Sequence, residues 1–339
     1  MRRAPGHAGR LSRWERLTFA VVFTLMAAFV AIVTVSAARA RQHNSGRASA
    51  ASGTAPAGPA TDPAWQPLAA RGGGGTPDLN GQAVRDSADQ ELSTALAPVL
   101  ARSRGNIAVG VVDLTTGARA GYAGRRSFPA AGIARADILA ALLLQHQGAA
   151  GLPGRSQREL ARRMVQDDAI AAAARLWGDV GGAAGLTIAD ARLHLRHTTP
   201  GGGFCGGLTS TTARDQLRLL TAFASARSPL SAASRSYALG LLRHVQPGQA
   251  WGVTEAASPG TSSAVQDGWL AVESGRLWVE DSIGVIHRGR QILLVAVLSD
   301  DQPTQTAGID EDEAAAVAAA GAIARPAPAR PALGGRQSG

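Results

Sequence analysis

The sequence contains no lysine, because all 34 of its basic residues are arginine. A Schiff base or a lysine general base is therefore excluded from any mechanism, since an arginine guanidinium stays protonated at physiological pH. Cys205 is the only cysteine, which excludes an intrachain disulfide. A thiol nucleophile would also need a histidine positioned beside it, so we expect Cys205 to be a small buried or loop residue. No pattern in the sequence calls for a metal or a cofactor.

The net charge of +9 is concentrated at the two ends of the chain. Residues 1–50 carry eight arginines against Glu15, and the segment after Ala324 adds three arginines and no acid. Residues 51–324 hold 23 arginines and 24 acids, which gives this part a net charge of −1. The expected folded part is therefore close to neutral, and the charge predicts no nucleic-acid-binding face.

An uncharged apolar run covers residues 17–38. Its 22 residues are enough for a helix that spans a membrane, which needs roughly 20. The basic segment 1–16 precedes it, so the positive-inside rule predicts a cytoplasmic N-terminus and an extracytoplasmic remainder. Cleavage of a secretory signal after Ala40 is the alternative, although signal h-regions usually span about 7–15 residues. A single-pass membrane protein is the favoured prediction, and a secreted protein is the alternative.

Downstream composition predicts a linker, one domain and a tail. Residues 39–83 are rich in Ala, Gly, Ser, Pro and Thr, which is typical of a flexible tether. Residues 84–324 show regular periodicity, and residues 325–339 form a Pro/Arg/Gly tail that we expect to be disordered.

Within the predicted domain, the periodicity indicates one helix, two strands, several helices, three strands and a last helix. The expected helices cover 83–103, 128–147, 157–177, 187–194, 212–226, 237–244 and 309–324, and the expected strands cover 106–113, 118–123, 263–272, 277–287 and 291–299. This order fits an α+β fold in which both ends of the chain share a five-stranded antiparallel sheet, flanked by the terminal helices, and about 130–250 forms a helical lobe.

Several phrases of the sequence resemble actinobacterial members of the serine β-lactamase and penicillin-binding-protein superfamily. They are 136–142 (ADILAAL), 175–177 (RLW), 207–212 (GLTSTT), 251–256 (WGVTEA) and 281–286 (DSIGVI). The resemblance covers about 84–324 and implies the β-lactamase/transpeptidase-like fold. In that family a Ser-x-x-Lys motif opens a buried helix, with serine as the nucleophile and lysine as its base.

In this chain the Ser-x-x-Lys motif falls on Gly132-Ile133-Ala134-Arg135. Glycine provides no nucleophile, and Arg135 cannot accept a proton. The Ser-Asp-Asn motif falls on Asp168-Ala169-Ile170, or, shifted by one residue, on Asp167-Asp168-Ala169. Neither placement restores the pattern, and Ile170 cannot hydrogen-bond a substrate amide.

The Lys-Thr-Gly motif falls on Gln266-Asp267-Gly268, where only the glycine is kept. The resemblance implies that the lysine helps to hold a substrate carboxylate; Gln266 is neutral, and Asp267 is expected to repel such a group. No other serine heads a Ser-x-x-Lys, although Ser127, Ser210, Ser262 and Ser282 lie near motif positions. His194-x-x-His197 has ligand-like spacing without an evident third ligand, which favours ordinary surface histidines.

Three functions remain open from the sequence. The first is a catalytically inactive, membrane-tethered domain that binds a peptidoglycan fragment or a cell-envelope protein. The second is an active serine hydrolase or β-lactamase-type enzyme with rearranged residues, with Asp168, Ser282 or His287 as candidates. The third is a purely structural exported domain whose cleft has collapsed.

Overall fold

The computed structural model describes residues 79–148, 151–202, 209–272 and 277–323, with side chains from Arg85 onward. These residues belong to one compact unit. The predicted segment 1–16, the apolar run 17–38, the linker up to residue 78, Cys205 and the tail 325–339 lie outside the described residues. Among the helices that are described, none combines the length and the apolarity needed to cross a membrane.

The centre of the fold is a five-stranded sheet in the order β2-β1-β7-β6-β5, with every neighbouring pair antiparallel. The strands are β1 (Asn106–Asp113), β2 (Arg119–Tyr122), β5 (Ala264–Val272), β6 (Leu277–Arg288) and β7 (Gln291–Gln302). The sheet joins segments from both ends of the sequence, so the predicted α+β arrangement with a discontinuous sheet is confirmed.

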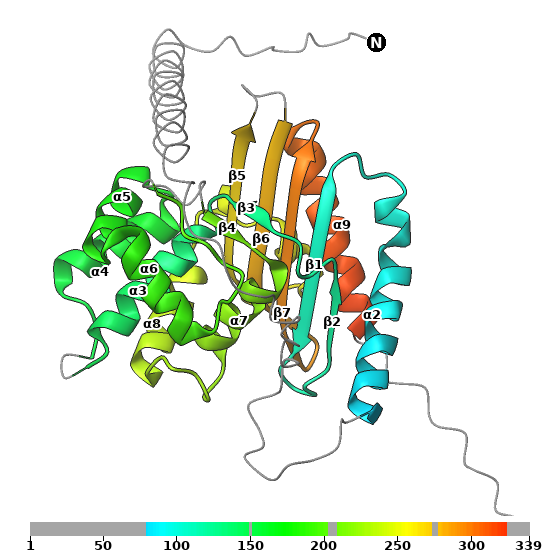
Figure 1. The fold of residues 1–339 in the computed structure, drawn as a ribbon, viewed down its shortest axis with the longest axis horizontal. Coiled ribbons are helices and arrows are strands. Elements are labelled where there is room, and N and C mark those ends of the chain that lie inside the picture. Colours follow the sequence, from blue (N-terminus) through cyan, green and yellow to red (C-terminus); the bar gives the residue numbers. More distant parts are fainter. Residues whose placement is uncertain (1–78, 149–150, 203–208, 273–276, 324–339) are drawn as a thin grey trace, which may run out of the picture. The chain divides into compact units, whose positions relative to one another are not determined.

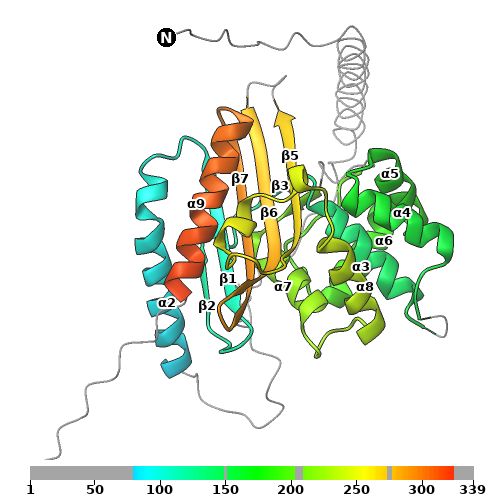
Figure 2. The same ribbon diagram turned by 180° about the vertical axis from the view of Figure 1, so that it is seen from behind.

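Helices cover both faces of the sheet (Figures 1 and 2). One face packs against α2 (Leu79–Leu100) and α9 (Gln305–Ile323), and the other packs against α7 (Ala213–Ala224) and the helical lobe. Because side chains alternate along a strand, β7 contributes to two separate cores. Val295 and Val297 belong to the α2/α9 core, whereas Ala296 and Leu298 belong to the lobe core.

The lobe surrounds α3 (Ala134–His146), which the sequence placed within 128–147. Every residue of α3 from Ala136 to Leu144 is buried, because α4–α8 pack around it. The surrounding helices are α4 (Arg155–Gln166), α5 (Ile170–Asp179), α6 (Gly182–Leu193), α7 and α8 (Ala232–Leu242). Two short 3₁₀ turns, η2 (Pro247–Gln249) and η3 (Gly252–Ala256), lead back to the sheet.

Three local features differ from what the sequence predicts. The helix expected over 157–177 is two helices, because the chain turns at Asp168 with φ at 53°. A two-stranded sheet of β3 (Phe128–Ala130) and β4 (Thr209–Thr211) was not predicted, since three residues carry little periodicity. Helix α9 begins at Gln305, four residues before the start expected at 309.

Candidate active-site cleft

The residues that the sequence predicts for the site lie where the turn before α3 meets strand β5. The backbone N–H of Ala131 donates a hydrogen bond of 2.8 Å to the carboxylate of Asp281 on β6. Asp281 is fully buried. Burial raises its pKa well above the ordinary value, with the Ala131 hydrogen bond acting in the opposite direction. This hydrogen bond holds the residues that lead into α3 against the sheet.

Gly132 and Gly268 touch each other through their backbones. A β-carbon on Gly132 would lie 2.6 Å from the Cα of Gly268 and 2.7 Å from the carbonyl oxygen of Asp267. A β-carbon on Gly268 would overlap the backbone nitrogen and Cα of Gly132. Real β-carbons do not approach other atoms this closely, so neither position can accept a side chain without backbone movement. The space that a side chain at Gly132 would need is therefore filled by main chain.

Arg135 forms an ion pair with Asp168. Its Nη2 atom lies 2.5 Å from Oδ1 of Asp168, and the two side chains are 15% and 31% exposed. The Nη1 atom of Arg135 also donates to the carbonyl oxygen of Gly132 at 3.4 Å. Burial raises the pKa of Asp168, and the guanidinium of Arg135 opposes this shift. The structure thus brings together three residues predicted for the site, and two of them form an ion pair.

Asp168 holds the left-handed conformation that separates α4 from α5. Asparagine and aspartate tolerate this conformation better than most residues. The neighbouring Asp167 points elsewhere and accepts a hydrogen bond of 3.0 Å from Arg162. Ile170 begins α5 and is 57% exposed. Of these residues, only Asp168 contacts the residue at the lysine position.

Gln266 and Asp267 are both buried, but on opposite faces of β5. The amide of Gln266 donates to the carbonyl oxygen of Asp267 at 3.2 Å. The Asp267 carboxylate accepts hydrogen bonds from the Trp251 backbone N–H at 2.7 Å and the Ser282 hydroxyl at 2.6 Å. It shares the strand face of Val265, which belongs to the α2/α9 core.

The expectation that Asp267 repels a carboxylate in the cleft is therefore wrong. Side chains of consecutive strand residues point to opposite faces, and Asp267 follows the residue at the lysine position. Burial raises the pKa of Asp267 to about 8, with the hydrogen bonds from Ser282 and Trp251 acting in the opposite direction. Asp267 is thus mostly protonated at neutral pH.

The serine that the sequence singled out on β6 is also turned away from the cleft. Ser282 is fully buried. Its hydroxyl donates to Asp267 and accepts a hydrogen bond of 2.9 Å from the Val253 backbone N–H. A substrate has no access to this oxygen, so the contact joins η3 to the sheet.

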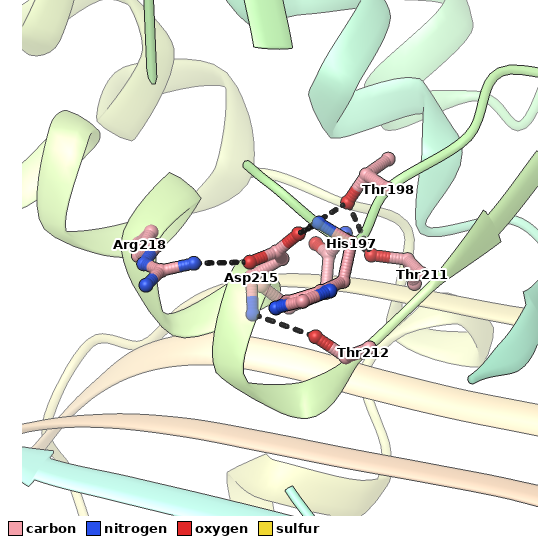
Figure 3. Close-up of polar contacts among 7 residues, drawn as sticks. His197, Thr198, Thr211, Thr212, Asp215 and Arg218 are labelled. Atoms are coloured by element: carbon pink, nitrogen blue, oxygen red, sulfur yellow. Dashed lines mark hydrogen bonds and ion pairs between the residues drawn. The ribbon is translucent and has the colours of Figure 1, made fainter. Parts of the chain in front are cut away.

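Sequence reasoning missed a buried polar cluster in the lobe, which Figure 3 shows around Asp215. Oδ2 of Asp215 accepts hydrogen bonds from the His197 backbone N–H at 2.6 Å and the Thr198 hydroxyl at 3.1 Å, while Oδ1 pairs with Arg218 at 2.6 Å. Thr212 caps α7 by accepting from the Asp215 N–H. The Thr-x-x-Asp spacing of such a cap was the available signal.

The histidines of the 194–197 pair serve local structure. His194 ends α6 in a left-handed conformation, and His197 contributes its backbone to Asp215. Among the described residues, no group of three or more His, Cys, Asp and Glu side chains is arranged to hold a metal ion.

Comparison with known proteins identifies the fold. No family model and no curated protein sequence matches the chain. A serine-to-glycine variant of the TLA-1 extended-spectrum β-lactamase matches with a TM-score of 0.61 and 14% identity, covering 71% of this chain and 99% of that one. A β-lactamase from Burkholderia vietnamiensis matches with a TM-score of 0.57 and 19% identity, covering 68% of this chain and 97% of that one.

A PBP-A variant solved as an acyl-enzyme complex with penicillin G also matches, with a TM-score of 0.58 and 16% identity over 69% of this chain and 96% of that one. The chain therefore has the fold of class A β-lactamases and PBP-A. The predicted resemblance is confirmed at the level of the fold.

Proposed function

We propose that this chain, whose fold is that of class A β-lactamases and PBP-A, is a catalytically inactive member of that fold. In this proposal the apolar run 17–38 tethers the domain outside the cytoplasmic membrane. The domain acts by binding a peptidoglycan fragment or a cell-envelope protein. The observation that supports the proposal is the backbone contact between Gly132 and Gly268, which leaves no room for a side chain at the position where the resemblance places the nucleophile.

The chemistry of the remaining residues supports inactivity. Acyl transfer on this fold requires an attacking oxygen and a neighbouring base that takes its proton. Gly132 supplies no oxygen, and Arg135 is a permanent cation engaged with Asp168. Removing a nucleophile or its base from a serine protease slows catalysis by about 10⁶-fold.

A covalent labelling experiment tests this inactivity. Full-length chain in mild detergent is incubated with a fluorescent penicillin beside the PBP-A variant that has been solved as an acyl-enzyme complex with penicillin G, and both are analysed by gel and intact mass. We expect label on the control protein alone. Stoichiometric penicilloyl addition to this chain would refute the proposal and favour a hydrolase with rearranged residues.

Binding is tested separately by thermal unfolding with and without purified muropeptides. A ligand that binds only the folded state raises the melting temperature in a concentration-dependent way. A rise with muropeptides favours the cell-wall ligand. If muropeptides do not raise the melting temperature and the domain captures no cell-envelope protein, the purely structural function is the one that remains.

A further inference from the structure

A groove lies outside the candidate cleft, between the end of α2, η3 and the exposed side of α9. Two adjoining hollows of about 470 and 510 Å³ form it. Its lining includes Val99 of α2, Glu255 of η3, and Ala314, Val317 and Ala318 of α9. Val317 is 43% exposed, which makes it one of the few large apolar side chains open to solvent among the described residues. This inference is independent of the function proposed above.

The lining residues of α9 form one stripe along the helix. They are Asp310, Glu313, Ala314, Val317 and Ala318, at the i, i+3, i+4, i+7 and i+8 spacing of a single helical face. The end of the stripe near the helix N-terminus is acidic, and the end near the C-terminus is apolar. An occupant that matches this order must place its cation beside Glu313 and its apolar residues beside Val317.

The acidic end carries like charges that oppose one another. Glu255, Asp310 and Glu313 line the first hollow together with Arg102, and Arg104 and Glu311 line the adjoining one. Burial and the carboxylates of Glu255 and Asp310 raise the pKa of Glu313, while a hydrogen bond from the Gly252 backbone lowers it. A further cation in this hollow would therefore reduce the repulsion among these carboxylates and be attracted by them.

The segment that follows α9 has the matching composition and starts at the apolar end. Residues 324–339 begin directly after Ile323 and contain Arg325, Arg330 and Arg336 but no acid. The first six of these residues are alanine, proline and Arg325, so an apolar stretch precedes Arg330. The basic residues 1–16, by contrast, are predicted to lie across the membrane.

The distances allow this segment to reach the acidic end. The helix from Glu313 to Ile323 is about 15 Å long at 1.5 Å per residue. A proline-rich extended chain from Ile323 to Arg330 spans about 22 Å at 3.1 Å per residue. The difference leaves room for a reversal after the helix. A reversed path would pass Val317 and Ala318 first and bring Arg330 to Glu313.

We propose that residues 324–339 bind in this groove of their own domain, antiparallel to α9, with Arg330 beside Asp310 and Glu313 and with alanine and proline over Val317 and Ala318. The arrangement covers the exposed stripe of α9 and neutralises its acidic end.

Photo-crosslinking of the full-length chain tests whether residues 324–339 bind in the groove. A benzoylphenylalanine replaces Ala327, the chain is irradiated in mild detergent, and the crosslinked peptides are identified by mass spectrometry. We expect crosslinks within the same chain to the stretch 314–321 of α9. Crosslinks mainly to the helical lobe, to a second differently tagged copy, or to no protein residue would each overturn the proposal.

Charge variants test whether the acidic residues Asp310 and Glu313 hold residues 324–339 in the groove. The double variant Asp310→Asn with Glu313→Gln keeps the hydrogen-bonding shape and removes the charge, so the crosslink yield should fall at least threefold. The matched control Glu91→Gln removes an acid from α2 outside the groove and should leave the yield unchanged. An unchanged yield in the double variant, with unfolding curves that verify folding, would refute the charge pairing that the proposal requires.

Discussion

The Cα atoms of Gly132 and Gly268 pack directly against each other, so the first turn of the buried helix α3 rests on the edge strand β5. Because a hydrogen atom is the only substituent that fits on either side, this contact is sensitive to any added side chain.

Replacing Gly268 with alanine should destabilise the domain by about 3 kcal/mol, because the added methyl group meets the main chain of Gly132 rather than a side chain that can move. Urea unfolding followed by circular dichroism measures the change. Gly240→Ala is the matched control: Gly240 lies inside α8, and its β-carbon would meet open space. That control should gain about 0.5–1 kcal/mol from helix propensity. Equal effects of the two variants would contradict the contact.

Introducing a Ser-x-x-Lys motif by Gly132→Ser together with Arg135→Lys should not produce acylation. The serine β-carbon would collide with Gly268 and Asp267, and the lysine would still face the carboxylate of Asp168. Labelling with fluorescent penicillin, beside a circular dichroism spectrum, measures the result. Covalent labelling of a folded double variant would show that the cleft opens more easily than this contact allows.

Breaking the ion pair should cost less than disturbing the glycines. Arg135→Met leaves the partly buried Asp168 carboxylate without its counter-charge, and we expect a loss of about 1–2 kcal/mol, between the values for surface and buried pairs. Asp168→Asn removes the charge of the carboxylate without straining the backbone, because asparagine also tolerates the left-handed conformation. A double-mutant cycle of the two gives the coupling energy. Additive effects would show that the pair contributes nothing.

The sheet and the buried helix could be predicted from the sequence, because both depend on local periodicity. Strand β7 contains the apolar run 292–298, and α3 carries apolar residues on all sides. The break at Asp168 could not be predicted, since two adjacent aspartates are tolerated within a helix. That conformation is accompanied by an ion pair with Arg135, which belongs to a separate helix.

The sequence shows glycine at 132 and arginine at 135, where the resemblance places a nucleophile and its base, but the close backbone packing at Gly132 could not be predicted. It depends on how closely α3 approaches β5, and a glycine in the sequence does not reveal its tertiary neighbour. The face occupied by Asp267 could have been inferred, because alternation from the apolar Val265 places both side chains on one side. Assigning it to the cleft from the motif alone gave the wrong prediction.

Raising the pH should lower the stability of the domain across the range from about pH 4 to pH 8. Burial raises the pKa of Asp267 and of Glu280 to about 8, and that of Asp190 to about 7, with repulsion from Glu311 and Asp215 adding to the last two. A carboxyl with a raised pKa binds its proton more tightly in the folded state than in the unfolded state. Its deprotonation above the unfolded pKa therefore favours unfolding, until the folded pKa is passed.

Urea unfolding at pH 5.5 and pH 8.5 should give the higher free energy of unfolding at pH 5.5. Glu280→Gln removes one of these protons while keeping the size of the side chain, so the difference between the two pH values should shrink in that variant. Glu159→Gln, on the surface of α4, is the control and should leave the difference close to that of the unaltered chain. Paired carboxylates with lowered pKa values would instead make the free energy of unfolding rise with pH. Higher stability at pH 8.5 would therefore show that these acids are charged in the folded domain.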